Sequence, residues 1–584
     1  KVVSLIIPLL CFSILSFGQS LLVKGTVKDN TGSPIPGATV VLKGTTQGTI
    51  TDQDGVYSLK DVSSNGVLVF SFVGMTTKEV SIAGQTSINV TLSSEVSDLD
   101  EVVVIGYGVQ RKEAVTGSVA SMKGEVLRDV ASSNITQALQ GRIPGVQMDQ
   151  TSTKPGAAMQ IRIRGNRSLT ASNDPLVVLD GIPFAGSIGD IDPNNIKSID
   201  ILKDASATAI YGSRGANGVI LVTSLKGNTK QKAQFSYNSY YGMKQVFGKY
   251  PMMNSKEFVK LRKDAGMYTN SLDEADNIDT DWQDLFYRKA NVTSHDIAVI
   301  GGTEQGNYTF GLGYYHDEAV VPTQQYNRIS IRASIDQNIG EYFKIGISSN
   351  SNYNISEGNQ IGIYGVLSMS PIANPYDSDG NFKRTIKMPL DEPWTISRDI
   401  INSLGDKWID ETKAVGSYNT AYGEVKIPGI EGLKYRANLG LNFRMTNGGT
   451  YTGEGVNSTT ATTVSTASIS HSLNTNWAIE NLLTYDRLFA EKHQVNIVAM
   501  YSAEQTTYNS SKVIAKDIPA DHFQYYNLGH ANGDFLIYPN DQNYEQSGLK
   551  SYMGRAMYSY DDRYMFTVTF RTDASSRLAD GYKW

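Results

Sequence analysis

Strict alternation of apolar and polar residues is the feature that most constrains how this 584-residue chain folds. From residue 433 to residue 444 every second side chain is apolar, and the intervening ones are Lys, Arg, Asn or Gly. Shorter runs of the same period lie at 308–314, 329–336 and 566–571. Such a period places one kind of side chain on each face of a β-strand. About 9 to 11 residues of this pattern cross a membrane as one barrel strand, with the apolar face toward lipid.

The connections between the alternating runs support a barrel, because short and long ones take turns. Tight turns are expected at 339–342, 428–432 and 561–563, and long connections at about 356–416, 445–463 and 503–548. Short periplasmic turns and long extracellular loops are typical of outer-membrane barrels. After the N-terminal region no stretch of about 18 apolar residues occurs, so no helical span is expected. A soluble sandwich would also alternate, but it needs neither strands of this length nor this order of loops.

The N-terminus has the pattern of a secretory signal peptide over residues 1–19, with its start missing. An almost wholly apolar run at 2–17 is followed by the small residue Gly18. A membrane anchor is the alternative, but it needs about 20 apolar residues. The one cysteine, Cys11, follows Leu10 rather than the small residue of a lipoprotein signal. If the peptide is removed, the mature chain has no cysteine, which excludes disulfides and cysteine chemistry.

Short apolar runs at 23–27, 39–42, 67–72 and 88–92, separated by frequent turns, predict the strands of a small β-sandwich over residues 20–93. Within it Asp52 and Asp54 precede Gly55 and hint at a calcium loop, but the later ligands of such a loop are missing. We therefore expect a tight hairpin turn at 51–55. None of the six histidines lies at metal-ligand spacing, and no metal site is predicted.

A short run with high strand propensity, 102–105, lies in a polar linker that we place at residues 94–110. No turn-linked partner strand is evident beside it. We therefore expect an unpaired strand that can add to the sheet of another protein. Two alternatives are an internal strand of a neighbouring domain and a dinucleotide loop, although Arg111 replaces the third glycine that such a loop needs.

Residues 111–227 mix short helices and strands and are long enough to form a core of their own. Helical segments are expected at 134–140 and 205–211, strands at 160–164, 176–179 and 218–223, and a turn at Asp180 and Gly181. Five basic residues are available to meet charges on a barrel wall, a solvated surface position being the alternative for each: Arg162, Arg164, Arg167, Lys203 and Arg214. Four glycines are expected to supply turns with positive φ: Gly165, Gly212, Gly215 and Gly218.

Four segments of this region resemble the plug domain of the SusC/RagA family of TonB-dependent outer-membrane transporters. They are Leu139-Gln-Gly-Arg-Ile-Pro-Gly145-Val, Ile161-Arg-Ile-Arg-Gly165-Asn-Arg-Ser168, Pro175-Leu-Val-Val-Leu-Asp-Gly-Ile-Pro183 and the run from Ile201 to Ile220. Residues 20–93 similarly resemble the carboxypeptidase-regulatory-like domain found at the front of such transporters, which implies no catalysis. The resemblance implies a mainly β fold: this β-sandwich, an α/β plug domain at 111–227 and, at 228–584, part of a large antiparallel transmembrane β-barrel of about 22 strands.

The resemblance also implies two sets of functional residues. The first is a TonB-binding segment, the TonB box of the family: Asp100, Glu101, Val102, Val103, Val104, Ile105, Gly106 and Tyr107. The second consists of plug motif residues: Arg162, Arg164, Gly165, Asp180, Gly181, Lys203, Tyr211, Gly212, Arg214 and Gly215. No catalytic residue, metal ligand or cofactor is implied.

A member of this family is expected to import an oligosaccharide or a peptide actively through the bacterial outer membrane. The implied partners are TonB with ExbB and ExbD, a SusD-like surface lipoprotein that acts as a lid, and outer-membrane lipid. The net charge of −6 gives no reason to expect nucleic acid. A non-transporting receptor or adhesin is the alternative, although it has no use for a plug or a TonB-binding strand. An outer-membrane hydrolase would need a nucleophile motif such as GxSxG, which the sequence lacks.

The long connection at 356–416 is rich in aromatic residues: Tyr364, Tyr376, Trp394 and Trp408. They could stack on sugar rings or dock a partner lid, or they could pack on one another. The strands expected in 228–584 are about half of a family barrel. We therefore expect the N-terminal part of a longer protein; the alternative is a truncated gene product, whose open sheet edge lipid does not tolerate.

Overall fold

The computed structural model describes residues 20–29, 32–45, 47–72, 75–92, 102–105, 108–111, 118–128, 135–204, 208–267, 269–456, 462–561 and 563–584. Two compact units are distinguished, residues 1–102 and 103–584, and each is described by itself. The predicted signal peptide lies outside the described residues, as do Asp100, Glu101, Gly106 and Tyr107 of the predicted TonB-binding segment.

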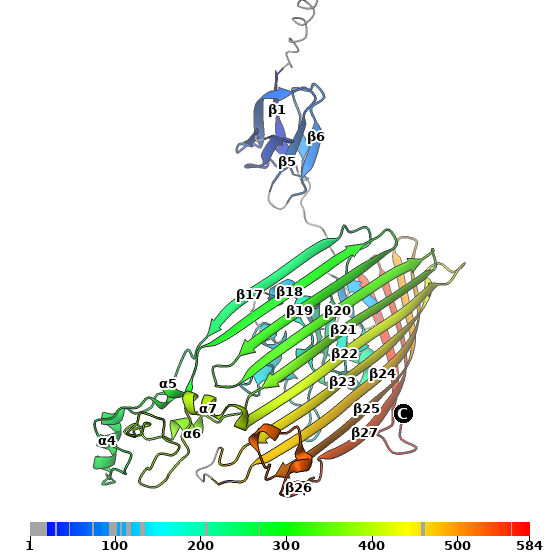
Figure 1. Ribbon diagram of the computed structural model, residues 1–584. Helices are drawn as coiled ribbons and strands as arrows, with labels where there is room; N and C mark the ends of the chain where they lie inside the picture. The colour runs from blue at the N-terminus through cyan, green and yellow to red at the C-terminus, as the bar shows by residue number, and fades with distance from the viewer. Residues whose placement is uncertain are drawn as a thin grey trace, which may run out of the picture. The chain divides into compact units, whose positions relative to one another are not determined.

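The first unit is a small β-sandwich, as its short apolar runs predicted (Figure 1). One sheet has the order β4-β1-β7 and the other β3-β2-β5-β6. The strands are β1 (Ser20–Lys28), β2 (Thr39–Leu42), β3 (Gly48–Ile50), β4 (Val56–Ser63), β5 (Val67–Ser71), β6 (Lys78–Ser81) and β7 (Val90–Thr91). Both sheets share one apolar core, in which the rings of Tyr57 and Phe70 meet edge to face. Before β4 the Asp52 carboxylate accepts hydrogen bonds from the N–H groups of Asp54 and Val56, at 3.0 and 2.8 Å. The predicted turn is therefore tight, but it is not a hairpin, because β3 and β4 belong to different sheets.

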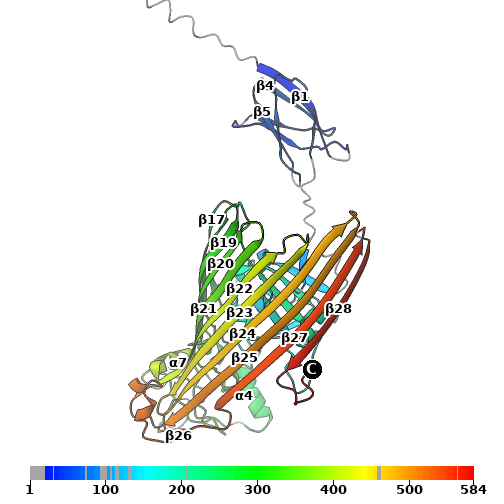
Figure 2. The same cartoon turned by 90° about the vertical axis from the view of Figure 1, so that its right-hand side faces the viewer.

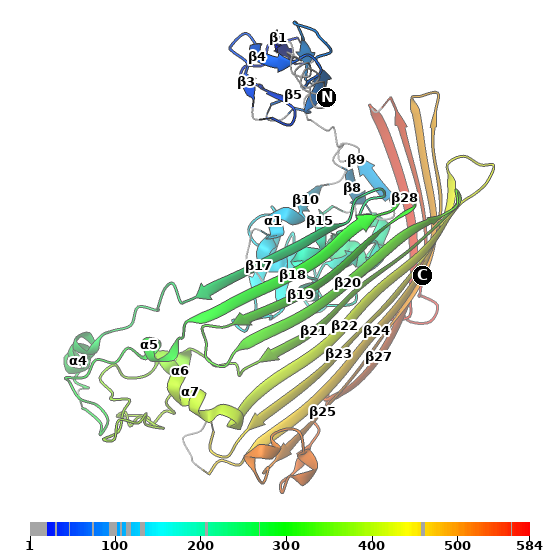
Figure 3. The same cartoon turned by 45° about the horizontal axis from the view of Figure 1, so that its top comes forward.

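Residues 118–227 of the second unit form a mixed α/β region, which we call the plug because it corresponds to the predicted plug domain (Figure 3). Its main sheet has the order β10-β15-β16-β13-β14, and β11 pairs with β12. The elements are β10 (Val119–Lys123), α1 (Gly124–Arg128), α2 (Ile135–Leu139), β11 (Val146–Gln150), β12 (Met159–Ile163), β13 (Leu176–Leu179), β14 (Ile182–Pro183), η2 (Ile188–Asp190), η3 (Pro193–Asn195), β15 (Ile196–Leu202), η4 (Ala209–Asn217) and β16 (Val219–Ser224). The central strand β16 begins with four buried apolar residues, because other elements cover both of its faces.

The rest of the second unit is one antiparallel sheet of twelve strands, the large sheet. Neighbours follow the chain from β17 to β25 and on to β27 and β28, and the short β26 pairs with β25. The strands are β17 (Gln234–Lys244), β18 (Ala290–Gly302), β19 (Gly306–Glu318), β20 (Gln325–Ile339), β21 (Phe343–Glu357), β22 (Trp408–Lys426), β23 (Leu433–Thr452), β24 (Thr466–Phe489), β25 (His493–Lys516), β26 (Phe535–Leu536), β27 (Gln542–Tyr560) and β28 (Tyr564–Ser575). Its helices are α4 (Ser255–Asp264), α5 (Trp282–Phe286), α6 (Tyr364–Leu367), α7 (Arg398–Leu404), η5 (Gly405–Lys407), η6 (Asp521–Phe523) and η7 (Leu528–His530). The sheet is curved, and within the described residues β17 and β28 form its two open edges (Figure 2).

Short turns and long loops alternate along the large sheet, as predicted. The strands are longer than expected, however, because β23 continues to Thr452 and β25 to Lys516. The loops that we expected from 445 and from 503 therefore begin only after those residues. The two longest strands, β24 and β25, have 24 residues each. At roughly 3.3 Å per residue they reach about 80 Å and extend well beyond a hydrocarbon layer of about 30 Å, even when tilted.

The faces of the large sheet are inverted relative to a soluble protein, with apolar residues outside and polar residues buried. On β20 the side chains of Ile331 and Ile335 are 47% and 59% exposed, whereas Arg332 and Ser334 between them are 6% exposed. The predicted alternating runs of β19, β23 and β28 likewise turn their apolar side chains outward. This is the arrangement of a wall with lipid on one side and a polar interior on the other. The described helices include none long and apolar enough to cross a membrane.

Candidate functional site: the plug and its contacts with the large sheet

A short loop of the plug, residues 187–195, carries two buried aspartates, and we call it the acid loop. Asp190 closes a capping box around η2, in which its carboxylate accepts from the backbone N–H of Ser187 at 3.0 Å. Asp192 caps η3 and accepts from the N–H of Asn194 at 3.0 Å. These local bonds fix the loop backbone and hold both carboxylates in one orientation.

Asp190 joins the plug to three strands of the large sheet. Its carboxylate accepts hydrogen bonds from the Tyr418 hydroxyl at 2.8 Å and from the Asn354 amide at 3.0 Å. Arg444 Nε lies 3.4 Å from the same carboxylate, and the Asn352 amide donates to the Asp190 carbonyl at 3.1 Å. Polar side chains on β21, β22 and β23 thus converge on one residue of the plug.

Asp192 forms the second contact of the acid loop, with β20. Its carboxylate accepts from the Ser330 hydroxyl at 2.7 Å and lies 3.7 Å from Arg328 Nη2. Arg328 also donates to the carbonyl of Gly189 at 3.3 Å. Both charged side chains are almost wholly buried, 3% exposed for Arg328 and 4% for Asp192. Burial alone would raise the pKa of the Asp192 carboxyl, but the Arg328 guanidinium and the bonds from Ser330 and Asn194 outweigh it, so the pKa lies below its usual range.

The lowered pKa of Asp192 predicts how the contact between plug and sheet depends on pH. A depressed carboxyl pKa contributes stability that is present above the unfolded value, about 3.9, and is lost as the pH falls through the folded value. We therefore expect resistance of the plug to protease to be constant from pH 7 to about pH 4 and to fall below that. Asp192→Asn should remove this part of the pH dependence, and an unchanged profile in that variant would contradict the assignment.

The other end of the plug contacts β24 to β28 through η4. Tyr211 is 1% exposed and packs in a cluster with Leu482, Met500 and Met553 of the large sheet. Burial raises the pKa of the Tyr211 hydroxyl well above its usual value. Arg214 forms an ion pair with Glu504 of β25. The plug is therefore fixed to two separate groups of strands.

Two hydrogen bonds join η4 to the edge strand β28. Arg571 donates to the carbonyl of Ile210, and the N–H of Ser213 donates to Asp573 at 3.2 Å. Gly212 has a φ of 61°, and a Cβ at this position would lie 2.0 Å from Asp573 Oδ2. Glycine is thus required at this position both for its backbone and for the close approach of β28.

The glycine prediction holds for Gly165, Gly212 and Gly218 but is wrong for Gly215. The first three have positive φ values of 85°, 61° and 92°, whereas Gly215 is not among the positive-φ glycines. A Cβ on Gly215 would lie 2.9 Å from the carbonyl oxygen of Thr208. Close packing inside η4, and not backbone handedness, explains this glycine.

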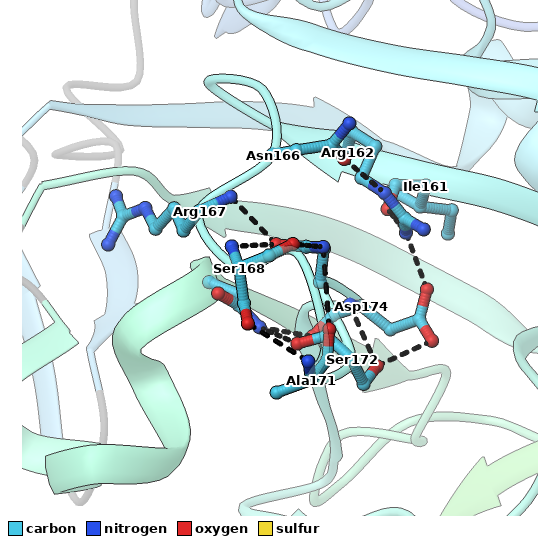
Figure 4. Close-up of polar contacts among 10 residues, drawn as sticks. Ile161, Arg162, Asn166, Arg167, Ser168, Ala171, Ser172 and Asp174 are labelled. Atoms are coloured by element: carbon cyan, nitrogen blue, oxygen red, sulfur yellow. Dashed lines mark hydrogen bonds and ion pairs between the residues drawn. The ribbon is translucent and has the colours of Figure 1, made fainter.

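Of the five basic residues that we expected to be available to the wall, Arg214 reaches a carboxylate of the large sheet. Arg162 instead pairs with Asp174 at 2.6 Å and donates to Asn166 at 3.0 Å, which holds the loop after β12 (Figure 4). Arg164 pairs with Asp204, and Lys203 donates to the carbonyl of Pro144 at 3.0 Å. These cations organise the plug itself.

Arg167 and the residues after it form a loop closed by its own polar groups (Figure 4). The Asn173 side chain accepts from the N–H groups of Arg167 and Ser168, at 2.7 and 2.8 Å, and donates to the Ser168 carbonyl at 2.7 Å. The guanidinium of Arg167 donates to the carbonyl of Ala216. The exposed Leu169 at the tip is thereby held on a fixed loop.

The predicted turn at Asp180 and Gly181 joins β13 to β14, and both residues have positive φ, 49° and 91°. The Asp180 carboxylate accepts from the N–H and the hydroxyl of Ser224, at 2.9 and 2.7 Å. Asp180 therefore ties the turn to the end of β16 and explains why this position carries a carboxylate.

The predicted TonB-binding run forms a strand, β8 (Val102–Ile105), but it is not unpaired. It makes a two-stranded sheet with β9 (Gly108–Arg111). The expectation of no partner strand beside it is therefore wrong, because β9 begins three residues after β8 ends and pairs with it. The partner occupies one edge of β8, so strand addition remains possible at the other.

The acid loop is the part of the site that sequence reasoning missed. A signal for Asp190 was present, because Ser187 and Asp190 have the S-x-x-D spacing of a capping box. No local pattern showed that these carboxylates would meet Arg328 and Arg444, which follow more than 130 residues later in the chain. Within the described residues, no group of three or more His, Cys, Asp or Glu side chains is placed to hold a metal ion.

Comparison with known proteins identifies both N-terminal regions. The TonB-dependent receptor plug domain matches residues 111–219, and the CarboxypepD_reg-like domain matches residues 23–104. The second match extends past 93, where we expected the sandwich to end, and includes most of β8.

Comparisons over almost the whole of this chain find TonB-dependent receptors. The chain is 33% identical to TonB-dependent receptor P26 of Formosa agariphila, over 98% of this chain and 58% of that protein. It is 32% identical to TonB-dependent receptor SusC of Bacteroides thetaiotaomicron, over 100% of this chain and 59% of that protein. Among solved structures, the RagAB peptide importer in its open-open state matches with a TM-score of 0.73 and 25% identity, over 83% of this chain and 57% of that one. The chain thus spans somewhat more than half the length of its relatives, which are receptors and not enzymes.

Proposed function

Since this chain is a homologue of the SusC/RagA-type TonB-dependent receptors, we propose that it serves the active import of an oligosaccharide or peptide across the bacterial outer membrane, with the plug as gate. The observation that carries the proposal is the acid loop. Its two buried aspartates are held by polar side chains on the inner face of a sheet whose outer face is apolar. A gate of this kind is closed by polar contacts, which can be exchanged for water when the plug moves.

In this proposal TonB supplies the force that breaks those contacts. TonB, energised through ExbB and ExbD, adds a strand to β8 and pulls on the chain that leads into the plug. Strand addition suits the task, because a row of backbone hydrogen bonds resists a pull without requiring a particular side chain. Rearrangement of the plug along the large sheet then opens a path for the substrate.

A SusD-like surface lipoprotein acts as the lid in this proposal and closes over the long loops. The loops 245–289 and 358–407 lie at the end of the strands opposite the tight turns, which is the extracellular end of an outer-membrane barrel. A lid there holds substrate between itself and the plug before TonB acts.

Uptake in cells with and without TonB tests the proposed function. Radiolabelled glycans and peptides are offered to the bacterium that carries this chain, to a strain lacking the chain and to a strain lacking TonB. We expect at least one substrate whose accumulation needs both proteins. Accumulation that needs the chain but not TonB, or binding at the surface without accumulation, would support a non-transporting receptor instead.

A further inference from the structure

A large apolar cavity lies between two long loops of the second unit, away from the acid loop. Residues 245–289, with α4 and α5, form one side, and residues 358–407, with α6, form the other (Figure 1). The cavity has a volume of about 1100 Å³. Pockets that bind small ligands measure roughly 300–1,000 Å³, so this one has room for a ligand of several residues.

Hydrogen bonds and an ion pair join the two loops, so the walls of the cavity are held together. The Trp282 indole N–H donates to the carbonyl of Ser370 at 2.9 Å, and the Thr280 hydroxyl donates to the carbonyl of Ala373 at 2.8 Å. Lys383 pairs with Asp273 at 2.8 Å. These bonds cross between the loops around the cavity and define its shape.

Methionine dominates the apolar lining of the cavity. Five of the chain's 15 methionines line it: Met252, Met253, Met267, Met369 and Met388. Met252, Met267 and the neighbouring Leu390 are 52%, 61% and 89% exposed, which is unusual for large apolar side chains gathered in one place. Flexible thioether side chains adapt to apolar groups of different shapes.

One buried polar group in the lining has unused hydrogen-bonding capacity. Glu274 Oε2 accepts from Arg262 at 3.0 Å and from the N–H of Ser271 at 3.1 Å, while Glu274 Oε1 is buried and has no hydrogen-bond partner. Its side chain is 1% exposed. A buried acceptor without a donor is unfavourable, so a ligand that brings an N–H group to Glu274 Oε1 would be stabilised there.

The remaining charges on the lining favour a ligand that is a donor or a cation. The acidic lining residues are Glu274, Asp279, Asp281 and Asp391, and the basic ones are Lys249 and Arg262. Four carboxylates against two cations leave an excess of two negative charges. An ammonium group or several peptide N–H groups would complement this excess.

The lining offers little on which a sugar ring could stack. Of its three aromatic residues, Trp282 is 5% exposed, the Arg262 guanidinium lies 5.3 Å from the ring centre of Phe258, and Tyr250 alone is well exposed, at 58%. Of the loop aromatics for which sugar stacking and mutual packing were both open, Trp394 packs edge to face on Trp408. Sugar hydroxyls buried against methionine would lose their bonds to water without replacement.

We infer that this cavity binds a peptide through a bulky apolar side chain, with an N–H or ammonium group of the peptide directed to Glu274. The inference rests on the proposed function, because it names a peptide as the substrate class. A glycan in place of a peptide is an outcome that the test below would reveal.

Two labelled pentapeptides test the inference on the full chain purified in detergent. Lys-Ala-Phe-Ala-Ala and Lys-Ala-Ser-Ala-Ala differ only in the central side chain, and fluorescence anisotropy measures the binding of each. We expect the phenylalanine peptide to bind at least about tenfold more tightly, because burial of its ring in the cavity removes apolar surface from water. Maltohexaose at millimolar concentration should not displace it.

Substitutions of exposed residues inside and outside the cavity distinguish binding in the cavity from binding elsewhere on the loops. Met252→Gln and Leu390→Gln change exposed lining residues and should cost little folding stability. Each should weaken the binding of the phenylalanine peptide by about tenfold. Leu272→Gln is the matched control, because Leu272 is 86% exposed in the same loop but does not line the cavity. Equal affinity for the two peptides, equal effects of all three variants, or displacement by maltohexaose would each overturn the inference.

Failure of the inference and failure of the proposed function give different results. If uptake needs TonB but neither peptide binds selectively, the cavity assignment is wrong and the import function stands. If the phenylalanine peptide binds the cavity but no uptake needs TonB, the import function is wrong and the peptide site stands.

Discussion

Removal of residues 100–107 is expected to reduce uptake to the level of a strain that lacks the chain, while the amount of protein at the cell surface stays unchanged. The deleted segment contains β8, and the described core residues of the sandwich and of the plug all lie outside it. Without it TonB has no strand to pair with, and no force reaches the plug. Uptake of labelled substrate and antibody binding to intact cells measure the two quantities.

Single substitutions within β8 give a sharper version of this experiment. Val103→Pro removes a backbone N–H and should impair strand addition. Val103→Thr keeps both the N–H and the high strand propensity, and it should transport normally. Equal uptake in the two variants would show that the strand is not the point of attachment.

The pairing of β8 with β9 changes how we expect TonB to bind. Two strands of four residues form a hairpin that is marginally stable in water by itself. TonB can therefore add to the free edge of β8 or replace β9. By either route, removal of residues 100–107 should abolish uptake.

The second large effect is expected from Asp192→Ala, which leaves the buried guanidinium of Arg328 without its carboxylate. Loss of one partner of a buried ion pair costs about 3–5 kcal/mol, because the remaining charge stays out of water. The expected result is a plug that is cut by protease in the folded protein. The rate of proteolysis measures this change.

Asp174→Ala is the matched control for that experiment. Asp174 also pairs with an arginine of the plug, at 2.6 Å, but its side chain is 67% exposed. Exposed ion pairs contribute about 0–1 kcal/mol. Similar protease sensitivity in the two variants would mean that the contact of Asp192 with Arg328 does not hold the plug.

Much of the large sheet was predictable because lipid imposes a local pattern on every strand. The alternation at 433–444 predicted both the strand β23 and which of its faces points outward. Glycine and acidic residues marked the tight turns. The extent of the strands was not predictable. Beyond a bilayer the outer face no longer has to be apolar, so the alternation stops at residue 444 while the hydrogen-bonded ladder of β23 continues to Thr452.

In the sandwich, strands β3, β4 and β6 escaped prediction. The exposed positions of β4 and β6 carry Lys, Asp, Glu and Ser, which hide a short strand when only apolar runs are followed. The contacts between the plug and the large sheet were still harder to predict from the sequence. The pairing of Asp192 with Arg328 and of Arg214 with Glu504 joins residues more than 130 positions apart, and nothing in either local sequence specifies the partner.

The most direct test of the plug as a moving gate is a reversible covalent lock between plug and wall. A Cβ on Gly440 of β23 would lie 2.7 Å from Cγ2 of Ile182 in β14, so Ile182→Cys with Gly440→Cys places two thiols close to bonding distance. The natural sequence has a single cysteine, Cys11, within the predicted signal peptide, so it should not interfere. We expect uptake to stop when the double variant is oxidised and to return on reduction, whereas uptake by the Ile182→Cys single variant should not respond to oxidation. Normal uptake through a fully oxidised, locked plug would contradict the account.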